Sequence, residues 1–147
     1  MRRFQKLEKI SEYINSFTVP GTGLKVVVTT AQADATSKLT RLSDRQVLAA
    51  RPECHQRGDG DSYSSEISTA FFVIEKRLEP ANTPEREDSQ FSELLTIAGD
   101  IVDKICNDIS SGSCNLLSGM SLSNVDIVPE SSLFGGWTGY SVELTFE

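Results

Sequence analysis

A thiol and an imidazole, two groups that often do covalent chemistry, lie side by side at Cys54 and His55. His55 is the single histidine of the chain, so a Cys-His or Ser-His-Asp site would have to use it. A nucleophile and its base must come within hydrogen-bond reach, whereas the side chains of adjacent residues diverge. We therefore predict that this pair is not catalytic and that the chain is not an enzyme.

Four residues of the chain could in principle supply the ligands of a zinc site. The nitrogen and sulfur donors of the chain are Cys54, His55, Cys106 and Cys114. Their spacing matches no zinc pattern, and Cys106 falls close to an apolar stripe, which predicts a small buried side chain. An odd number of cysteines without CxxC spacing favours reduced thiols. No metal and no cofactor are expected.

Two further kinds of motif were considered as ligand-binding sites, one for calcium and one for phosphate. Asp59-Gly60-Asp61-Ser62 is similar to the start of a calcium loop, but an EF-hand needs glutamate at position twelve, where this chain has Ala70. Gly21-Thr22-Gly23 and Gly135-Gly136 lack the flanking residues of phosphate-binding loops. We interpret the first motif as a soluble loop and the glycine pairs as turns.

The longest element predicted from the sequence is a helix from Ser89 to Gly112. Its stripe has apolar residues three and four apart: Phe91, Leu94, Leu95, Ala98, Ile101, Val102, Ile105 and Ile109. Asp88 or Ser89 is the predicted N-cap, and Gly112 the stop. Three acidic residues of this helix are predicted to be solvated: Asp100, Asp103 and Asp108.

The remaining pattern predicts a shorter helix over residues 2–17 and strands over 24–30, 66–76, 122–128 and 139–146. Apolar residues of the last segment alternate with polar ones, which predicts a half-buried strand with a solvated or partner-facing side. The fold expected is α+β, an antiparallel sheet of about four strands packed with two helices in the order α-β-β-α-β-β. Residues 1–147 are expected to form a single domain.

Residues 31–65 are mostly polar and too long for an ordinary connection. A short helix is predicted over 44–51, with Ser43 as its N-cap. The rest is expected to be an excursion that reaches out to a neighbour or is disordered.

Composition and hydropathy argue against two classes of function, general nucleic-acid binding and membrane insertion. The net charge is −7, from 21 acidic and 14 basic residues, which argues against a general nucleic-acid binder. No apolar run approaches the roughly 20 residues that cross a bilayer, so no membrane partner is expected. The N-terminus lacks the apolar stretch of a signal peptide, and synthesis in a cytoplasm is the expectation.

The C-terminal sequence contains Val125-Asp126-Ile127-Val128-Pro129, followed by the segment Leu133 to Phe146. It resembles the ending of small connector proteins of tailed bacteriophages, the tail terminator and tail-completion group. The element order resembles theirs as well, whereas the excursion at 31–65 departs from it. The resemblance implies a structural virion subunit that forms a cyclic ring at the head–tail connector or tail end.

Such a subunit would be made in the host bacterial cytoplasm and would reside in the virion. Its partners would be further copies of itself, neighbouring connector or tail proteins, and DNA that passes through the ring without sequence-specific binding. The predicted interface residues are Arg41, Arg45, Arg51, Arg57, Asp59, Asp61, Phe134 and Trp137. The alternative is an adaptor or inhibitor that binds a cellular protein through residues 31–65, and a third is an enzyme that uses Cys54 and His55.

Overall fold

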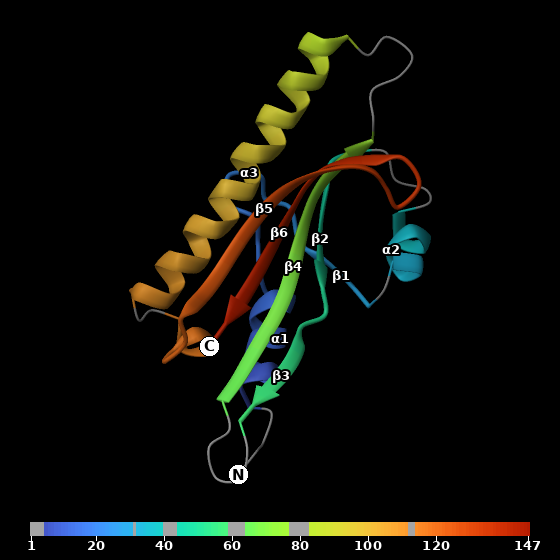
Figure 1. Cartoon of the computed structure of the whole chain (residues 1–147). Coiled ribbons are helices and arrows are strands. Elements are labelled where there is room, and N and C mark those ends of the chain that lie inside the picture. The colour runs from blue at the N-terminus through green and yellow to red at the C-terminus, as the bar shows by residue number, and fades with distance from the viewer. Residues whose placement is uncertain (1–4, 31, 40–43, 59–63, 77–82, 112–113) are drawn as a thin grey trace.

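The computed structural model describes residues 5–30, 32–39, 44–58, 64–76, 83–111 and 114–147 (Figure 1). Within these residues the chain forms three α-helices, a short 3-10 helix and six strands. The helices are α1 (Gln5–Asn15), α2 (Gln32–Leu39) and α3 (Pro84–Ser110), and the 3-10 helix is η1 (Asn115–Leu117). The strands are β1 (Val27–Thr29), β2 (Gln46–Ala50), β3 (Glu53–Arg57), β4 (Ser64–Lys76), β5 (Leu122–Leu133) and β6 (Trp137–Phe146).

All six strands belong to one sheet, in the order β1-β2-β4-β6-β5, with β3 pairing to β4 beside β2. β1 and β2 are parallel, and the other pairs are antiparallel. β4 is central and pairs with β2, β3 and β6, and it confirms the strand predicted at 66–76. The α+β prediction is confirmed. The expected four strands and two helices were too few, and the sheet is mixed, not antiparallel throughout, because β1 and β2 are parallel.

The long helix begins earlier than the sequence pattern predicted. Thr83 is the N-cap, because its side-chain oxygen accepts a hydrogen bond from the backbone N–H of Arg86 at 3.3 Å. Pro84 takes the first helical position, where the N–H that it lacks would have no partner in the helix. The prediction of an N-cap at Asp88 or Ser89 is therefore wrong, and Gly112 lies outside the described residues.

The main core lies between the sheet and two helices, α1 and α3. From α3 it takes Leu94, Ile97, Ala98, Ile101 and Ile105, and from α1 it takes Ile10, Tyr13 and Ile14. The sheet contributes alternate residues of its strands: Val47, Ala49, Ile67, Phe71, Val73, Val142, Leu144 and Phe146. The predicted stripe thus holds the core, except that Leu95 is 43% exposed.

The opposite face of the sheet has a smaller core at one end only. Ala35 and Leu39 of α2 pack there with residues from the other parity of the strands, Leu48, Ile74 and Trp137. The β5–β6 turn folds back over this cluster, and the Phe134 ring meets Phe72 edge-on at 5.4 Å. The two helices α1 and α3 therefore cover one face, and α2 covers an end of the other.

Polar clamps tie the helices to the sheet and to each other. Arg45 donates hydrogen bonds to Glu75 of β4 at 3.0 Å and to Glu93 of α3 at 2.7 Å. Burial opposes the charge of Arg45, but the hydrogen bonds and attraction of these carboxylates outweigh it, so the pKa of Arg45 is raised. Tyr13 of α1 donates to Asp108 of α3 at 2.5 Å.

Residues 31–65 contain α2, β2 and β3, so much of the predicted excursion belongs to the sheet. The predicted helix at 44–51 is wrong. Val47 and Leu48 instead belong to strand β2, which pairs with β4 on one side. On its other side β2 pairs with β1, where Leu48 is aligned with Val27.

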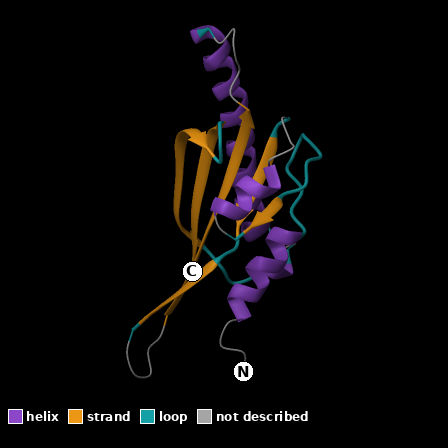
Figure 2. Cartoon of the chain, turned by 90° about the vertical axis from the view of Figure 1, so that its right-hand side faces the viewer, coloured by secondary structure: helices purple, strands orange, loops and turns teal. Residues whose placement is uncertain are grey.

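Two parts of the fold extend beyond the main sheet at opposite ends. The first turns of α3 project past the strands at one end, and the ribbon of β3 with the start of β4 projects at the other (Figures 1 and 2). The pairing of β4 with β6 begins at Ile67, which leaves the start of β4 paired with β3 alone.

Candidate functional site

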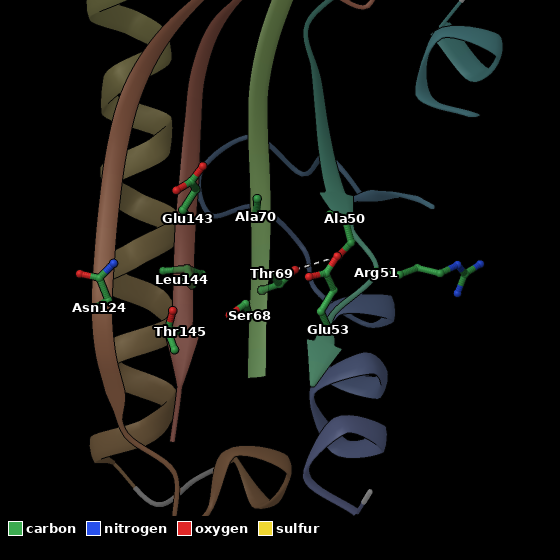
Figure 3. Close-up of a pocket in the computed structure, with 10 residues that line it drawn as sticks. All are labelled: Ala50, Arg51, Glu53, Ser68, Thr69, Ala70, Asn124, Glu143, Leu144 and Thr145. Carbon is green, nitrogen blue, oxygen red and sulfur yellow. Dashed lines mark hydrogen bonds between the residues drawn. The ribbon is translucent and has the colours of Figure 1, made fainter. Parts of the chain in front are cut away.

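The sheet face that carries α2 has short and polar side chains over the half that α2 does not cover. Strand pairing sets these residues in rows across β4, β6 and β5. Ser68, Thr145 and Asn124 form one row, and the next is Ala70, Glu143 and Asp126. These rows are called the open face below. In Figure 3 this face is towards the viewer, with α1 and α3 behind the strands.

A shallow hollow of about 270 Å³ lies on the open face (Figure 3). Its floor is formed by small side chains of β2 and β4, and the Thr69 hydroxyl donates to the Ala50 carbonyl at 2.7 Å. Glu53 and Glu143 stand at its rim, whereas the Arg51 side chain extends away from it. The charged groups beside the hollow are therefore mainly acidic.

The acidic character continues along β5 and β6. Asp126 is directly opposite Glu143, and both side chains are exposed. The Asn124 amide donates to Asp126 Oδ2 at 2.7 Å, and the Ser141 hydroxyl donates to Glu130 Oε1 at 3.2 Å. Adjacent like charges with polar neighbours give a surface of negative potential, which repels phosphate groups.

The described residues do not assemble the chemical sites considered above. Cys54 pairs with Ile67 and packs against the main core, while His55 is the next residue of β3 and points to the other face. His55 Nε2 lies 3.6 Å from the Glu53 carboxylate, and both side chains are largely exposed. Among the described residues, no group of three or more His, Cys, Asp or Glu side chains could hold a metal ion.

Two predictions about single side chains are corrected. Cys106 was expected to be buried but is exposed, because it lies on the flank of α3 away from the packed stripe. Asp108 was expected to be solvated but is half-buried, with Tyr13 and Lys104 as its hydrogen-bond donors. Asp100 and Asp103 are exposed, as predicted.

The basic members of the predicted interface set are scattered over the fold. Arg45 is held in its clamp with Glu75 and Glu93, and Arg51 donates to the Thr30 hydroxyl at 3.0 Å. Arg57 ends β3, and its side chain is outside the described part, as are Arg41, Asp59 and Asp61.

The aromatic members of that set lie together inside the chain's own second cluster. Phe134 and Trp137 are both buried there, and Lys76 Nζ lies 5.4 Å from the centroid of the Trp137 ring system. A role for any of these residues at an interface remains a prediction.

The acids that the sequence predicted at an interface were Asp59 and Asp61, and the acids of the open face were missed. The alternation over 139–146 did mark Glu143 as facing solvent or a partner. Asp126 and Glu53 carried no such signal, because their strands pair with partners distant in sequence. The pairing of β5 with β6 brings Asp126 to Glu143.

No helix in the described part of the chain is long and apolar enough to span a membrane. A scan of protein-family models gives no match to this sequence, and a comparison with curated proteins gives none either.

Proposed function

We propose that this chain is a structural subunit of a tailed-bacteriophage connector or tail-end ring, with its open face towards the DNA channel. One observation carries the proposal. Helices α1 and α3 cover one face of the sheet, while the uncovered half of the other face carries an acidic row that includes Asp126 and Glu143.

An acidic surface suits a channel through which DNA must move. Lys and Arg on such a wall would bind phosphates and release counterions, and each such contact would add a binding step. Carboxylates on the wall repel the phosphates, so the duplex stays mobile. The clustering of Glu53, Asp126 and Glu143 on the open face supports this orientation.

A ring also needs surfaces that reach adjacent subunits, and cyclic assemblies close through heterologous contacts. The β3–β4 ribbon and the first turns of α3 project from opposite ends of the sheet (Figures 1 and 2). Pro84 to Ser89 are exposed at the second of these projections. These two projections are the proposed sites of contact with adjacent subunits.

The test is to purify phage particles from cells that express the chain with an epitope tag at its C-terminus. Fractionation with quantitative mass spectrometry should recover the chain in the particles at a fixed, small copy number. Labelling with an antibody to the tag should place it at the head–tail junction or tail end. Recovery only in the particle-free fraction would contradict the proposal.

The same fractionation separates the alternative, an adaptor or inhibitor of a cellular protein. In that case the chain would co-purify with one host protein and would be missing from washed particles. A tagged capsid protein, followed through the same steps, controls for particle loss.

A further inference from the structure

The two long edges of the sheet differ in how well they are protected. The edge at β1 is only three residues long, and Lys38 Nζ lies 2.6 Å from the Val28 carbonyl, which it caps. Short strands and lysine side chains are common devices against pairing with another chain. In the described chain the opposite edge, β5, is twelve residues long and is the last strand of the sheet.

The edge at β5 is also where exposed apolar side chains gather. Within the described residues, the exposed large hydrophobic side chains are Leu95 at 43%, Ile127 at 38% and Val128 at 41%. Ile127 and Val128 are successive residues of β5 and therefore point to opposite faces of the sheet. An edge strand with apolar residues on both faces is suited to pairing.

The third residue, Leu95, is on the flank of α3 that faces β5. The other flank of α3 is polar and faces β2 and α1, through the Glu93–Arg45 and Asp108–Tyr13 contacts. On the β5 side the Phe91 ring meets Tyr140 of β6 at 5.7 Å. Leu95 lies one helical turn further along this flank.

Leu95 and Ile127 also lie at nearly the same level along the parallel axes of α3 and β6. Tyr140 is paired with Pro129, and two residues further along β6, Val142 is paired with Ile127. Four helical residues span about 6 Å and two strand residues about 7 Å, so the step from Phe91 to Leu95 matches that from Tyr140 to Val142.

Pro129 indicates which backbone groups of β5 face outward. Proline has no N–H, and within a sheet it is confined to edge strands with its nitrogen turned away from the neighbouring strand. Residues two and four positions before it share its direction, so Ile127 and Val125 present their N–H and C=O groups to the open edge. The N–H and C=O groups of Ile127 and Val125 can pair with another strand, whereas Pro129 offers only its C=O, so one hydrogen bond is missing at that position.

We propose that a second copy of this chain occupies this edge, and that the two β5 strands pair antiparallel across a two-fold axis at Ile127. Ile127 then lies opposite Ile127 of the partner subunit, and Asp126 lies opposite Val128 of the partner subunit. A shift by two residues in one direction would bring the two Asp126 carboxylates together, and a shift in the other would set Asp126 against Glu130 of the partner subunit. The register centred on Ile127 is the one that avoids both repulsions.

The second copy is favoured because the patch is self-complementary, as a two-fold interface requires. The axis at Ile127 brings together the two Ile127 side chains and the two Leu95 flanks on the helix-covered side. A two-fold dimer is closed and does not propagate into a ring, so this inference concerns the free subunit and does not rest on the proposed function.

Analytical ultracentrifugation over a range of concentrations tests the pairing. The wild type should show a concentration-dependent dimer. Ile127→Lys should weaken dimerisation by more than about tenfold, because it sets two like charges directly opposite each other. Thr96→Lys, the same new charge on the exposed side of α3, should leave it unchanged. Circular dichroism checks that both variants fold.

Cysteine cross-linking tests the register. Directly opposite residues of a hydrogen-bonded pair have Cα atoms about 5.5 Å apart, within disulfide range. Cys106 is an exposed free thiol, so the test uses a Cys106→Ser background. In that background mild oxidation should link Ile127→Cys into dimers, and Val125→Cys and the background itself should stay unlinked. A monomer at all concentrations, or equal linking of both variants, would overturn the proposal. A larger cyclic oligomer that is unaffected by Ile127→Lys would also overturn it while supporting the ring function.

Discussion

Asp126 of β5 lies directly opposite Glu143 of β6 on the face of the sheet that α1 and α3 leave uncovered. Like charges in opposite positions of an antiparallel pair oppose folding, by about 0.2–1 kcal/mol. Packing of the apolar residues on the other face, such as Val142 and Leu144, outweighs this cost. The Asp126–Glu143 pair therefore does not stabilise the fold. We propose that its role is to repel phosphate groups.

The first prediction concerns that repulsion. The wild-type protein should bind duplex DNA no more tightly than a neutral control protein at low salt. The double variant Asp126→Lys, Glu143→Lys should bind measurably, and its affinity should fall steeply as salt is added, because new phosphate contacts release counterions. Fluorescence anisotropy with a labelled duplex measures both.

Its matched control changes the charge equally on another surface. Asp100 and Asp103 are exposed on α3, on the helix-covered side of the sheet. If Asp100→Lys, Asp103→Lys gives the same gain in DNA affinity, the location of the open-face acids is irrelevant. Tight, salt-sensitive binding by the wild type would instead indicate a nucleic-acid function.

Two adjacent leucines of α3 provide a test of the core. Leu94 is fully buried, whereas Leu95 is 43% exposed. Leu94→Ala should lower the free energy of unfolding by about 2–5 kcal/mol by leaving a cavity, and Leu95→Ala by less than about 1 kcal/mol. Urea unfolding measures both, and equal losses would mean that the helix is rotated from the orientation described here.

The Tyr13–Asp108 contact predicts a dependence of stability on high pH. Burial first, and then the hydrogen bond and negative charge of Asp108, raise the pKa of Tyr13 above its ordinary value. A raised folded-state pKa contributes stability that is complete below about pH 10, the unfolded value, and is lost as the pH rises above it.

Tyr13→Phe isolates this effect, because it removes the titrating hydroxyl and leaves Lys104 beside Asp108 at 3.1 Å. At pH 7 the variant should be less stable by about 1–2 kcal/mol. The difference from wild type should shrink as the pH rises above about 10. A difference that stays constant to pH 11 would refute the assigned role of Tyr13.

Two glycines are predicted to respond in opposite ways to alanine. A Cβ at Gly139 of β6 would lie 1.9 Å from the Val73 carbonyl oxygen, and the residue has a φ of +153°. Gly139→Ala should therefore separate β4 from β6 locally and cost several kcal/mol, about 3 or more. A Cβ at Gly99 of α3 meets nothing within 4 Å, so Gly99→Ala should gain about 0.5–1 kcal/mol. Thermal unfolding of the pair checks both signs.

The sequence was sufficient where one element's own periodicity decides its structure. The stripe of α3 and the alternation of β6 predicted their buried faces, with Leu95 as the exception. The sequence was insufficient where pairing with strands distant in sequence decides whether a segment is a helix or a strand. Val47, Leu48 and Ala49 form a short apolar run that suits a helix or a strand, and β4 and β1 make it a strand.

Proline misled the boundaries twice. The helix was predicted to begin at Ser89, five residues after Pro84, although proline suits the first position of a helix. The predicted strand over 122–128 stops before Pro129, yet β5 continues to Leu133 because an edge strand accepts proline. The acidic site was predicted in part only, since Glu143 was visible from alternation and its neighbour Asp126 depends on the pairing of two strands.

Electron cryo-microscopy of the assembled particle tests the central claim most directly. The map should contain a closed ring of this chain around the DNA channel, with Glu143 and Asp126 facing the lumen and α1 and α3 facing outward. A ring whose lumen is lined by α3, or a particle map without this chain, would contradict the account.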